Sequence, residues 1–273
     1  MQEIVIEAGR TERQYWHDLW RYRELFYFLA WRDILIRYKQ TIVGAAWAIL
    51  RPLLTMIVLT IVFGRLAKVP SPAGVPYPIL VFCGVLPWQF FSTAVSDSGQ
   101  SLVLNSSLIS KVYFPRMTVP ASSVMTSLVD LLISGALLAV LMVWYGFVPP
   151  SSVVLLPLVI VLAFAAAFGV GVWISALMVK YRDFRFVVPF LVQFGLYVSP
   201  VGFTTDIVPP QWRLIYSINP MVGVIDAFRR VLIGPQTAIY WPGFAISLTV
   251  VALVLVTGVH HFRRTERTFA DVI

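Results

Sequence analysis

The sequence predicts an all-α integral membrane protein that crosses the bilayer with six helices. Of its 273 residues, 59% are hydrophobic and only 12% are charged, against roughly 25% charged residues in a soluble globular domain. Several apolar stretches also reach the ~20 residues that a helix needs to span a membrane. The strands of a membrane β-barrel would be about 10 residues long and would alternate in polarity, which these stretches do not.

The chain divides into three predicted parts. Residues 1–42 form an N-terminal segment with an amphipathic interfacial helix, 43–262 form the transmembrane domain, and 263–273 form a tail. No internal repeat and no second, soluble domain is predicted. The six spans are expected at about 43–66, 79–101, 117–145, 153–179, 186–203 and 241–262.

Lys and Arg concentrate on one side of these predicted spans. The N-terminal segment, the loops 102–116 and 180–185 and the tail carry most of them, whereas the opposite side carries few. Because cationic loops stay in the cytoplasm, both termini are predicted to be cytoplasmic. The net charge of +8 therefore indicates orientation in a membrane, and nucleic acid is not predicted as a partner.

The N-terminal segment ends in a basic and aromatic helix. Trp31, Leu35 and Tyr38 recur at helical spacing on one face, while Asp33 and Arg37 fall on another. We expect this helix to lie in the cytoplasmic interface, with its rings among the headgroups and its cations toward anionic lipid. Its direct connection to the first span suggests that the membrane domain is driven from the cytoplasmic side through this helix. The alternative is that the helix only anchors the chain to lipid.

Acidic residues are scarce within the predicted spans. Asp97 and Asp130 are the two found there, and a carboxylate in the membrane is a candidate functional group because its burial costs several kcal/mol. Asp130 therefore supports a proton-coupled secondary carrier as an alternative, although no partner is evident at its depth.

Other polar residues recur every four positions and predict either close helix packing or a hydrated path: Ser92, Ser96 and Gln100 in the second span, and Ser122, Thr126, Asp130 and Ser134 in the third.

The motifs of common active sites are absent from the sequence. It has no phosphate-binding GxxxxGK[ST] loop, no histidine cluster suited to zinc, and no Ser or Cys nucleophile with an evident base. Neither an enzyme active site nor a metal site is predicted. Any energy for a mechanical cycle must then come from elsewhere.

Three connections have a composition that favours contact or movement. Residues 105–116, NSSLISKVYFPR, include a predicted short helix from about 106 to 113, and residues 180–185, KYRDFR, mix both charge signs with aromatic rings. Such mixtures suit protein contacts better than the cations that topology alone requires. The proline-rich outer connection 204–240 predicts two short helices at or dipping into the outer interface, which form either a gate or an inert surface.

Five blocks of the sequence resemble the membrane subunit of type-2 ABC exporters: 32–53, 110–116, 178–190, 197–203 and 218–232. The branch they resemble most is that of the polysaccharide and polyol-phosphate exporters, which move O-antigen, capsule or wall teichoic acid. The resemblance implies a homodimer in the bacterial inner (plasma) membrane. It also implies two copies of a separate cytoplasmic ABC ATPase that bind ATP and Mg²⁺, so that this chain has no cofactor and is not itself an enzyme.

The resemblance further implies a cargo and site residues. The cargo would be an O-antigen-like polysaccharide linked to polyprenyl pyrophosphate and exported from the cytoplasmic side; teichoic acid, capsule, lipid or drug cargo are alternatives. Arg51 is the pyrophosphate candidate, because a guanidinium pairs bidentately with phosphate, and lipid-headgroup anchoring is its alternative. The ATPase-docking candidates are Trp31, Arg37, Ser106, Ser107, Leu108, Lys111, Tyr113, Phe114 and Arg116. The channel candidates are Trp47, Trp88, Phe91, Phe194, Tyr197, Ser92, Ser96 and Asp130, and the gate candidates are Trp212, Tyr216, Asn219 and Arg229.

Overall fold

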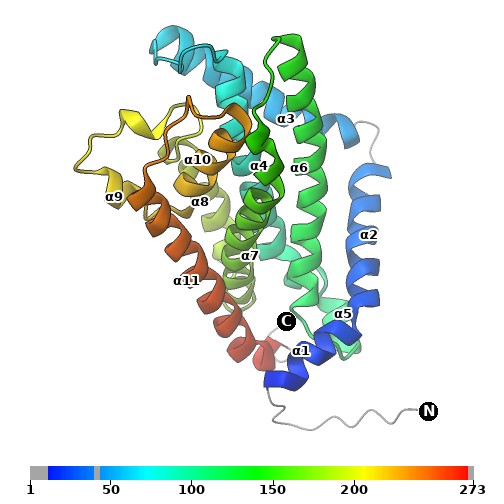
Figure 1. Ribbon diagram of the computed structural model, residues 1–273. Helices are drawn as coiled ribbons and strands as arrows, with labels where there is room; N and C mark the ends of the chain where they lie inside the picture. The colour runs from blue at the N-terminus through cyan, green and yellow to red at the C-terminus, as the bar shows by residue number, and fades with distance from the viewer. Residues whose placement is uncertain (1–11, 40–43, 270–273) are drawn as a thin grey trace.

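A computed structural model describes residues 12–39 and 44–269, which form helices joined by turns and loops. Predicted features at 40–43 and in the tail beyond 269 lie outside the described residues. Figure 1 shows the long helices running side by side in one bundle. The longer helices are α1 (Glu12–Arg21), α2 (Arg23–Lys39), α3 (Gly44–Leu59), α4 (Tyr77–Leu104), α6 (Thr118–Trp144), α7 (Leu156–Lys180), α8 (Phe184–Val198), α10 (Pro220–Ile233) and α11 (Trp241–Thr265). The short ones are η1 (Thr60–Leu66), α5 (Ser106–Lys111), η2 (Ser151–Leu155), η3 (Thr205–Ile207), α9 (Arg213–Tyr216) and η4 (Glu266–Thr268).

Five helical segments of the described chain are long and apolar enough to cross a membrane. They agree with five of the predicted spans to within three residues. They are Ala46–Leu66, Tyr77–Leu104, Thr118–Trp144, Ser151–Lys180 and Trp241–Thr265. The predicted span 186–203 corresponds to α8, whose 15 residues extend about 22 Å, less than the ~30 Å of a hydrocarbon core. Pro200 explains the early end of α8, because the residue before a proline disfavours the helical conformation. The prediction of six spans is therefore not confirmed.

α4 is the central helix of the bundle. It contacts α3, α6, α7, α8 and α10, and nearly every side chain from Ile79 to Phe91 is buried. Because neighbouring helices surround it, the first half of α4 carries apolar side chains on all faces and not on one stripe. The other four spans bury much less of their surface and keep large apolar side chains exposed.

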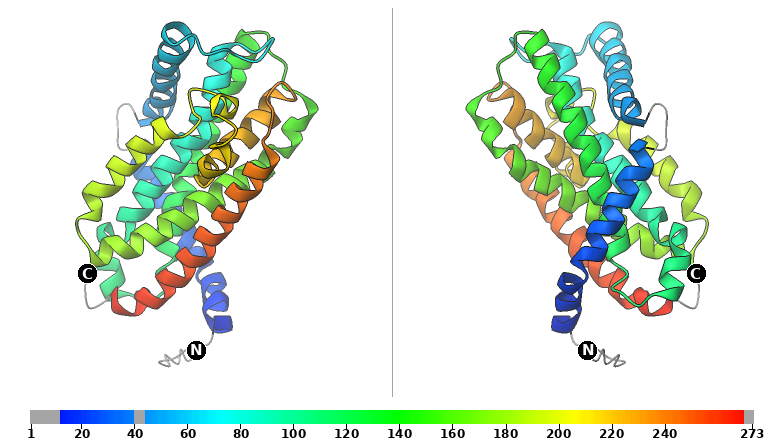
Figure 2. Two further views of the ribbon diagram at one scale, coloured as in Figure 1. Left: turned by 90° about the vertical axis from the view of Figure 1, so that its left-hand side faces the viewer. Right: turned by 90° about the vertical axis from the view of Figure 1, so that its right-hand side faces the viewer.

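α2 runs alongside α6 (Figures 1 and 2) and contacts it along its length. Trp31 is half exposed, as the amphipathic pattern predicts, and Leu29 is buried. We expected Tyr38 and Arg37 to meet lipid headgroups, and this detail was wrong. Both side chains turn toward acids of α4 and α6, because a carboxylate in the bundle needs a cation or a donor.

A separate hydrophobic cluster closes the end of the bundle at which α1 lies. Leu29, Ile109 and Phe269 pack in it, and they come from α2, α5 and the residue after η4. The Glu266 carboxylate accepts a hydrogen bond from the Arg116 backbone N–H at 2.6 Å, and the Glu266 carbonyl accepts one from the Arg116 guanidinium at 2.5 Å. The two ends of the described chain and the loop around α5 are thus joined in one layer.

The outer connection contains short helices, as predicted. α9 is one turn long, whereas α10 is buried against α4, α7 and α11, so the alternative of an inert surface helix fails for α10. Asn219 begins α10: its side chain accepts from the Met221 N–H at 3.0 Å and donates to the Ser199 hydroxyl at 2.8 Å. A gating role for these helices stays a prediction.

Candidate functional site

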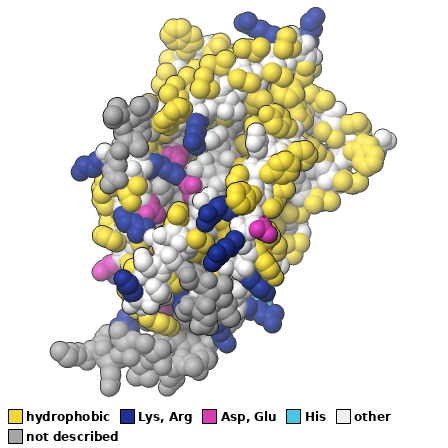
Figure 3. All heavy atoms as spheres, turned by 180° about the vertical axis from the view of Figure 1, so that it is seen from behind, with side chains coloured by type: hydrophobic (Ala, Val, Ile, Leu, Met, Phe, Trp, Pro, Cys, Tyr) yellow, Lys and Arg dark blue, Asp and Glu magenta, His cyan; other side chains and the backbone are white. Residues whose placement is uncertain are grey.

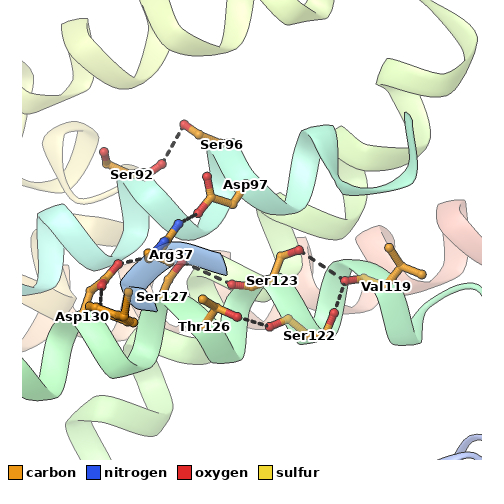
Figure 4. Close-up of polar contacts among 11 residues, drawn as sticks. Arg37, Ser92, Ser96, Asp97, Val119, Ser122, Ser123, Thr126, Ser127 and Asp130 are labelled. Carbon is orange, nitrogen blue, oxygen red and sulfur yellow. Dashed lines mark hydrogen bonds and ion pairs between the residues drawn. The ribbon is translucent and has the colours of Figure 1, made fainter. Parts of the chain in front are cut away.

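Charged side chains from three helices meet at one point of the bundle. Arg37 of α2 lies between Asp97 of α4 and Asp130 of α6 (Figure 4). Its Nη1 donates to Asp130 Oδ2 at 2.5 Å, and its Nη2 donates to Asp97 Oδ2. The Tyr38 hydroxyl donates to the second oxygen of Asp130. We call these four residues the Arg37 cluster.

The Arg37 cluster is partly open to solvent. The side chains of Arg37, Asp97 and Asp130 are 29%, 36% and 20% exposed. Burial opposes the charge of Arg37, but the two carboxylates outweigh it and raise the pKa of the guanidinium. Burial raises the pKa of Tyr38, and the bond to Asp130 adds to this effect. An ion pair of intermediate burial such as this one helps to hold α2 against α4 and α6.

Two cavities adjoin the Arg37 cluster and share Arg37 and Asp97. One, of ≈ 410 Å³, lies among α2, α3, α4 and α6 and is also lined by Trp47 and Arg51. The other, of ≈ 710 Å³, extends to Asn105 at the end of α4. Arg37 and Asp97 therefore lie between the two spaces. Figure 3, seen from behind, shows cationic and acidic side chains gathered near the middle of a largely hydrophobic surface.

Asp130 has partners that the sequence analysis did not find. We saw no group at its depth, yet Arg37 and Tyr38 both bond to it. Charged residues inside a membrane bundle are generally paired, so these contacts remove the objection that Asp130 lacks a partner, and by themselves they do not separate a proton-coupled carrier from another transporter.

The predicted polar faces have two different roles. Ser122 and Thr126 are buried, and their hydroxyls donate to carbonyls of their own helix, as does the partly buried Ser96, which bonds to the Ser92 carbonyl. Such hydroxyls need no water, which favours close packing. Ser134 and Asp130 line the smaller cavity beside the Arg37 cluster, and Thr126 also borders the larger one.

The aromatic channel candidates do not form one surface within a single chain. Trp88 and Phe91 are 5% and 9% exposed, and their rings lie 5.7 Å apart in the core. Trp47 is half exposed and lines the smaller cavity. Phe194 and Tyr197 are exposed on α8. Their common role as a channel lining stays a prediction.

The candidate docking loop is partly a structural element. Residues 106–111 form α5, shorter than the predicted helix to about 113. Lys111 and Tyr113 are exposed, Phe114 is buried, and Arg116 bonds to Glu266. Of the other docking candidates, Ser107 and Trp31 are exposed, Ser106 and Leu108 are half-buried, and Arg37 belongs to the Arg37 cluster. The accessible tip of the loop is therefore residues 110–113.

Arg229 is the most deeply placed of the gate candidates. It is 1% exposed, and its guanidinium donates to the carbonyls of Val201 at 2.8 Å, Phe203 at 2.6 Å and Leu80 at 3.3 Å. These bonds tie α10 to α4 and to the chain after α8. Tyr216 is half-buried, whereas Trp212 is exposed.

Two contacts were not predicted from the sequence: that between Arg37 and the two acids, and that between Arg116 and Glu266. Arg37 and Asp130 lie 93 positions apart, and Arg116 and Glu266 lie 150 apart, so no local pattern joins them. One signal was present: acids within a bundle demand a counter-charge, and Arg37 stands on the helix that adjoins the first span.

Comparison with known proteins agrees with this architecture. Residues 24–233 match the family described as ABC-2 type transporter. The chain is 28% identical over 259 residues to the O-antigen export system permease protein RfbA of Myxococcus xanthus, covering 94% of this chain and 98% of that protein. It is 27% identical to RfbA of Klebsiella pneumoniae, covering 89% and 92%, and 23% identical to the polysialic acid transport protein KpsM of Escherichia coli, covering 81% and 84%. With five segments of the described chain long and apolar enough to cross a membrane, and a family match over most of its length, the chain is a multi-pass membrane protein that belongs to the ABC-2 type transporter family.

Proposed function

We propose that this chain is the permease subunit of an ATP-driven exporter that moves a polyprenyl-pyrophosphate-linked, O-antigen-like polysaccharide across the bacterial inner membrane. The observation that carries the proposal is the match, along nearly the whole chain, to relatives named as O-antigen export permeases. A relative named for polysialic acid transport supports glycan cargo more broadly.

In this proposal two copies of the chain work with two copies of a separate cytoplasmic ATPase. The layer formed by α1, α5 and η4 would face that partner, because cationic residues gather at this end of the bundle. Both termini would then be cytoplasmic. The exposed tip 110–113 would be the point of contact, and aromatic and cationic side chains such as Tyr113 and Lys111 suit it.

The Arg37 cluster supports a route for the mechanical signal. Force on the cytoplasmic layer would reach α2, which is tied through Arg37 to Asp97 of α4 and Asp130 of α6. Movement of α2 would therefore change the wall between the two cavities. ATP binding by the partner would be converted in this way into movement of the spans that surround the cargo path.

Surface glycan in a strain that lacks the chromosomal copy tests the proposed cargo. Cells without the chain should accumulate lipid-linked glycan on the cytoplasmic side, and the plasmid-borne chain should restore surface glycan. Normal surface glycan without the chain would refute the proposal.

Co-purification with the ATPase tests the proposed docking tip. Lys111→Glu combined with Tyr113→Ala should reduce capture of the ATPase because the cation and the aromatic ring among the four exposed side chains of the tip are changed. Lys68→Glu is the matched control, since Lys68 is exposed and lies in the connection before α4, on the opposite side. Equal capture of the ATPase by both variants would show that the docking site lies outside residues 110–113.

A further inference from the structure

We infer that a cavity at the cytoplasmic ends of α4 and α7 and the beginning of α8 binds the lipid-linked diphosphate of the cargo. The inference rests on the proposed function and deepens it. The cavity has a volume of ≈ 340 Å³. We call it the arginine notch, and its lining includes Gln100, Leu104, Ser106, Arg182, Arg185 and Phe186.

The arginine notch has positive charge without a partner. In the part of the chain that the structure describes, neither Arg182 nor Arg185 takes part in an ion pair. Asp183 is the one acid among the lining residues and lies beyond ion-pair distance of both guanidiniums. Two such guanidiniums match a diphosphate, since each presents a planar fork of donors to one phosphate group. The side chains of Gln100 and Ser106 add neutral donors.

The cavities beside the Arg37 cluster suit a diphosphate less well. Arg37 is already bound to Asp97 and Asp130, and Arg51 shares its cavity with both acids. The two cations of that cavity are thus balanced by two carboxylates, which leaves no net positive charge to attract a diphosphate. In the larger cavity Arg32 is paired with Asp33 at 2.8 Å. The arginine notch is therefore a better diphosphate site than the surroundings of Arg51.

The apolar part of the arginine notch points to a lipid ligand. Leu104 and Phe186 are 75% and 76% exposed beside the two arginines. The spans Tyr77–Leu104 and Ser151–Lys180 both end at the notch, which is the level at which phosphate headgroups lie. A cationic rim over exposed apolar side chains fits a prenyl diphosphate, whose charged group carries a long apolar chain.

The position of the arginine notch also connects it with the channel candidates. Phe186, Phe190 and Phe194 follow one another four residues apart on α8 and are all exposed. The rings of Phe190 and Phe194 are stacked with centroids 6.4 Å apart. A diphosphate held at the start of α8 would place the first sugars of the cargo beside this aromatic face.

Binding of farnesyl diphosphate to the purified chain, without the ATPase, tests the inference. The wild type should bind it, and Arg182→Ala combined with Arg185→Ala should weaken binding about tenfold or more, because two charge-assisted contacts are lost. Lys180→Ala is the matched control: it removes a neighbouring cation that does not line the notch and should change affinity less than about twofold. The double Arg→Lys variant should bind with intermediate affinity, which also shows that loss of binding is not loss of folding.

Competition identifies the source of the phosphate. Unlabelled farnesyl diphosphate should displace labelled farnesyl diphosphate from the chain better than farnesyl monophosphate, phosphatidylglycerol or inorganic pyrophosphate does. Equal displacement by phosphatidylglycerol would show a general phospholipid site and overturn the inference, and so would equal displacement by inorganic pyrophosphate, because the prenyl chain would then contribute nothing.

Three further results would also overturn it: no binding by the wild type, wild-type affinity in the double Ala variant, or loss of affinity on Arg51→Ala instead. Loss of ATPase capture with retained farnesyl diphosphate binding would assign Arg182 and Arg185 to docking. If binding depends on these arginines while cells lacking the chain still show normal surface glycan, the proposed export function fails and the prenyl diphosphate site stands.

Discussion

Single residues in this protein act mainly by pairing distant helices. Arg37 joins α2 to α4 and α6, and Arg229 joins α10 to α4. Neither residue has its partner nearby in the sequence. Their importance comes from the cost of leaving a charge or a carbonyl without a partner in a poorly solvated bundle. The effect of substituting such a residue on stability or on helix coupling therefore depends on its partner as much as on the residue itself.

Arg37→Ala should destabilise the protein by roughly 1–3 kcal/mol, because it leaves Asp97 and Asp130 facing each other without a cation. Thermal unfolding in detergent measures the effect. Arg51→Ala is the matched control: it removes a guanidinium from the same cavity that makes no ion pair in the described structure, and should change stability by less than about 0.5 kcal/mol. Equal effects of the two variants would contradict a stabilising role for the Arg37 cluster.

Asp226 of α10 should contribute a pH dependence to stability. Its carboxylate accepts from the Thr205 hydroxyl at 2.7 and 2.8 Å, but burial dominates and raises its pKa to about 6. The folded protein therefore holds this proton more tightly than the unfolded chain. Its contribution to stability must fall as pH rises from about 4 to about 6 and stay constant above that range.

Asp226→Asn should remove that contribution. Thermal unfolding of both proteins between pH 4 and 8 should show the wild type losing on the order of 2 kcal/mol relative to the variant as pH rises to about 6. Subtracting the variant cancels the titration of other acids. A difference between the two proteins that is the same at every pH would rule out a raised pKa for Asp226.

At the scale of helices, glycines set the closest approach. α7 and α11 cross where Gly169 and Gly258 meet: a Cβ on Gly258 would lie 2.5 Å from the Gly169 carbonyl oxygen, and one on Gly169 would lie 2.8 Å from Leu255 Cα. Both obstacles are backbone atoms, which cannot turn aside. Small residues of this kind let membrane helices pack through their backbones.

Gly258→Ala should therefore destabilise the protein by about 1–3 kcal/mol, since α7 and α11 must separate. Gly135→Ala is the matched control, because a Cβ there meets nothing within 4 Å and alanine favours the helix by about 0.5–1 kcal/mol. Opposite changes in melting temperature are expected. If Gly135→Ala loses as much stability as Gly258→Ala, the effect comes from the membrane environment and not from the close crossing of α7 and α11.

At the scale of the whole molecule, α3 and α8 are the least enclosed parts of the bundle. α8 keeps Phe190, Phe194 and Tyr197 exposed, and the first span is largely exposed as well. The proposed second copy would cover these faces and complete the channel. Aromatic side chains that look unrelated in one chain would then share one surface.

Cross-linking in membranes tests that arrangement. In a Cys83→Ser background, which removes the native cysteine, Phe194→Cys should form disulfide-linked dimers because equivalent α8 helices would face one shared path. Val161→Cys is the control, since Val161 is equally exposed (62%, against 58% for Phe194) but lies on α7. Cross-links at position 161 and none at 194 would show that the dimer interface involves α7 and not α8, which would contradict the proposed channel.

Prediction from the sequence succeeded where the physics is local. Apolar length and composition gave five spans to within three residues, and the spacing of Trp31 and Leu35 predicted α2. It was weaker where a proline shortened a helix, as at Pro200 after α8. It left open whether α10 lies on the surface or inside the bundle, because an amphipathic segment of 14 residues has the same sequence pattern in both positions.

The sequence by itself determined the membrane class, five of the six predicted spans and the family, because hydrophobic length and the order of motifs are properties of the linear chain. Only the tertiary structure decided which charges meet. Arg37 could pair with Asp97 and Asp130 only after α2 had packed along α6, and Arg116 with Glu266 only after the last helix had returned to the end where α1 lies. Side-chain contacts fall off within a few ångströms, so partners 60 to 150 positions apart are chosen by folding in three dimensions.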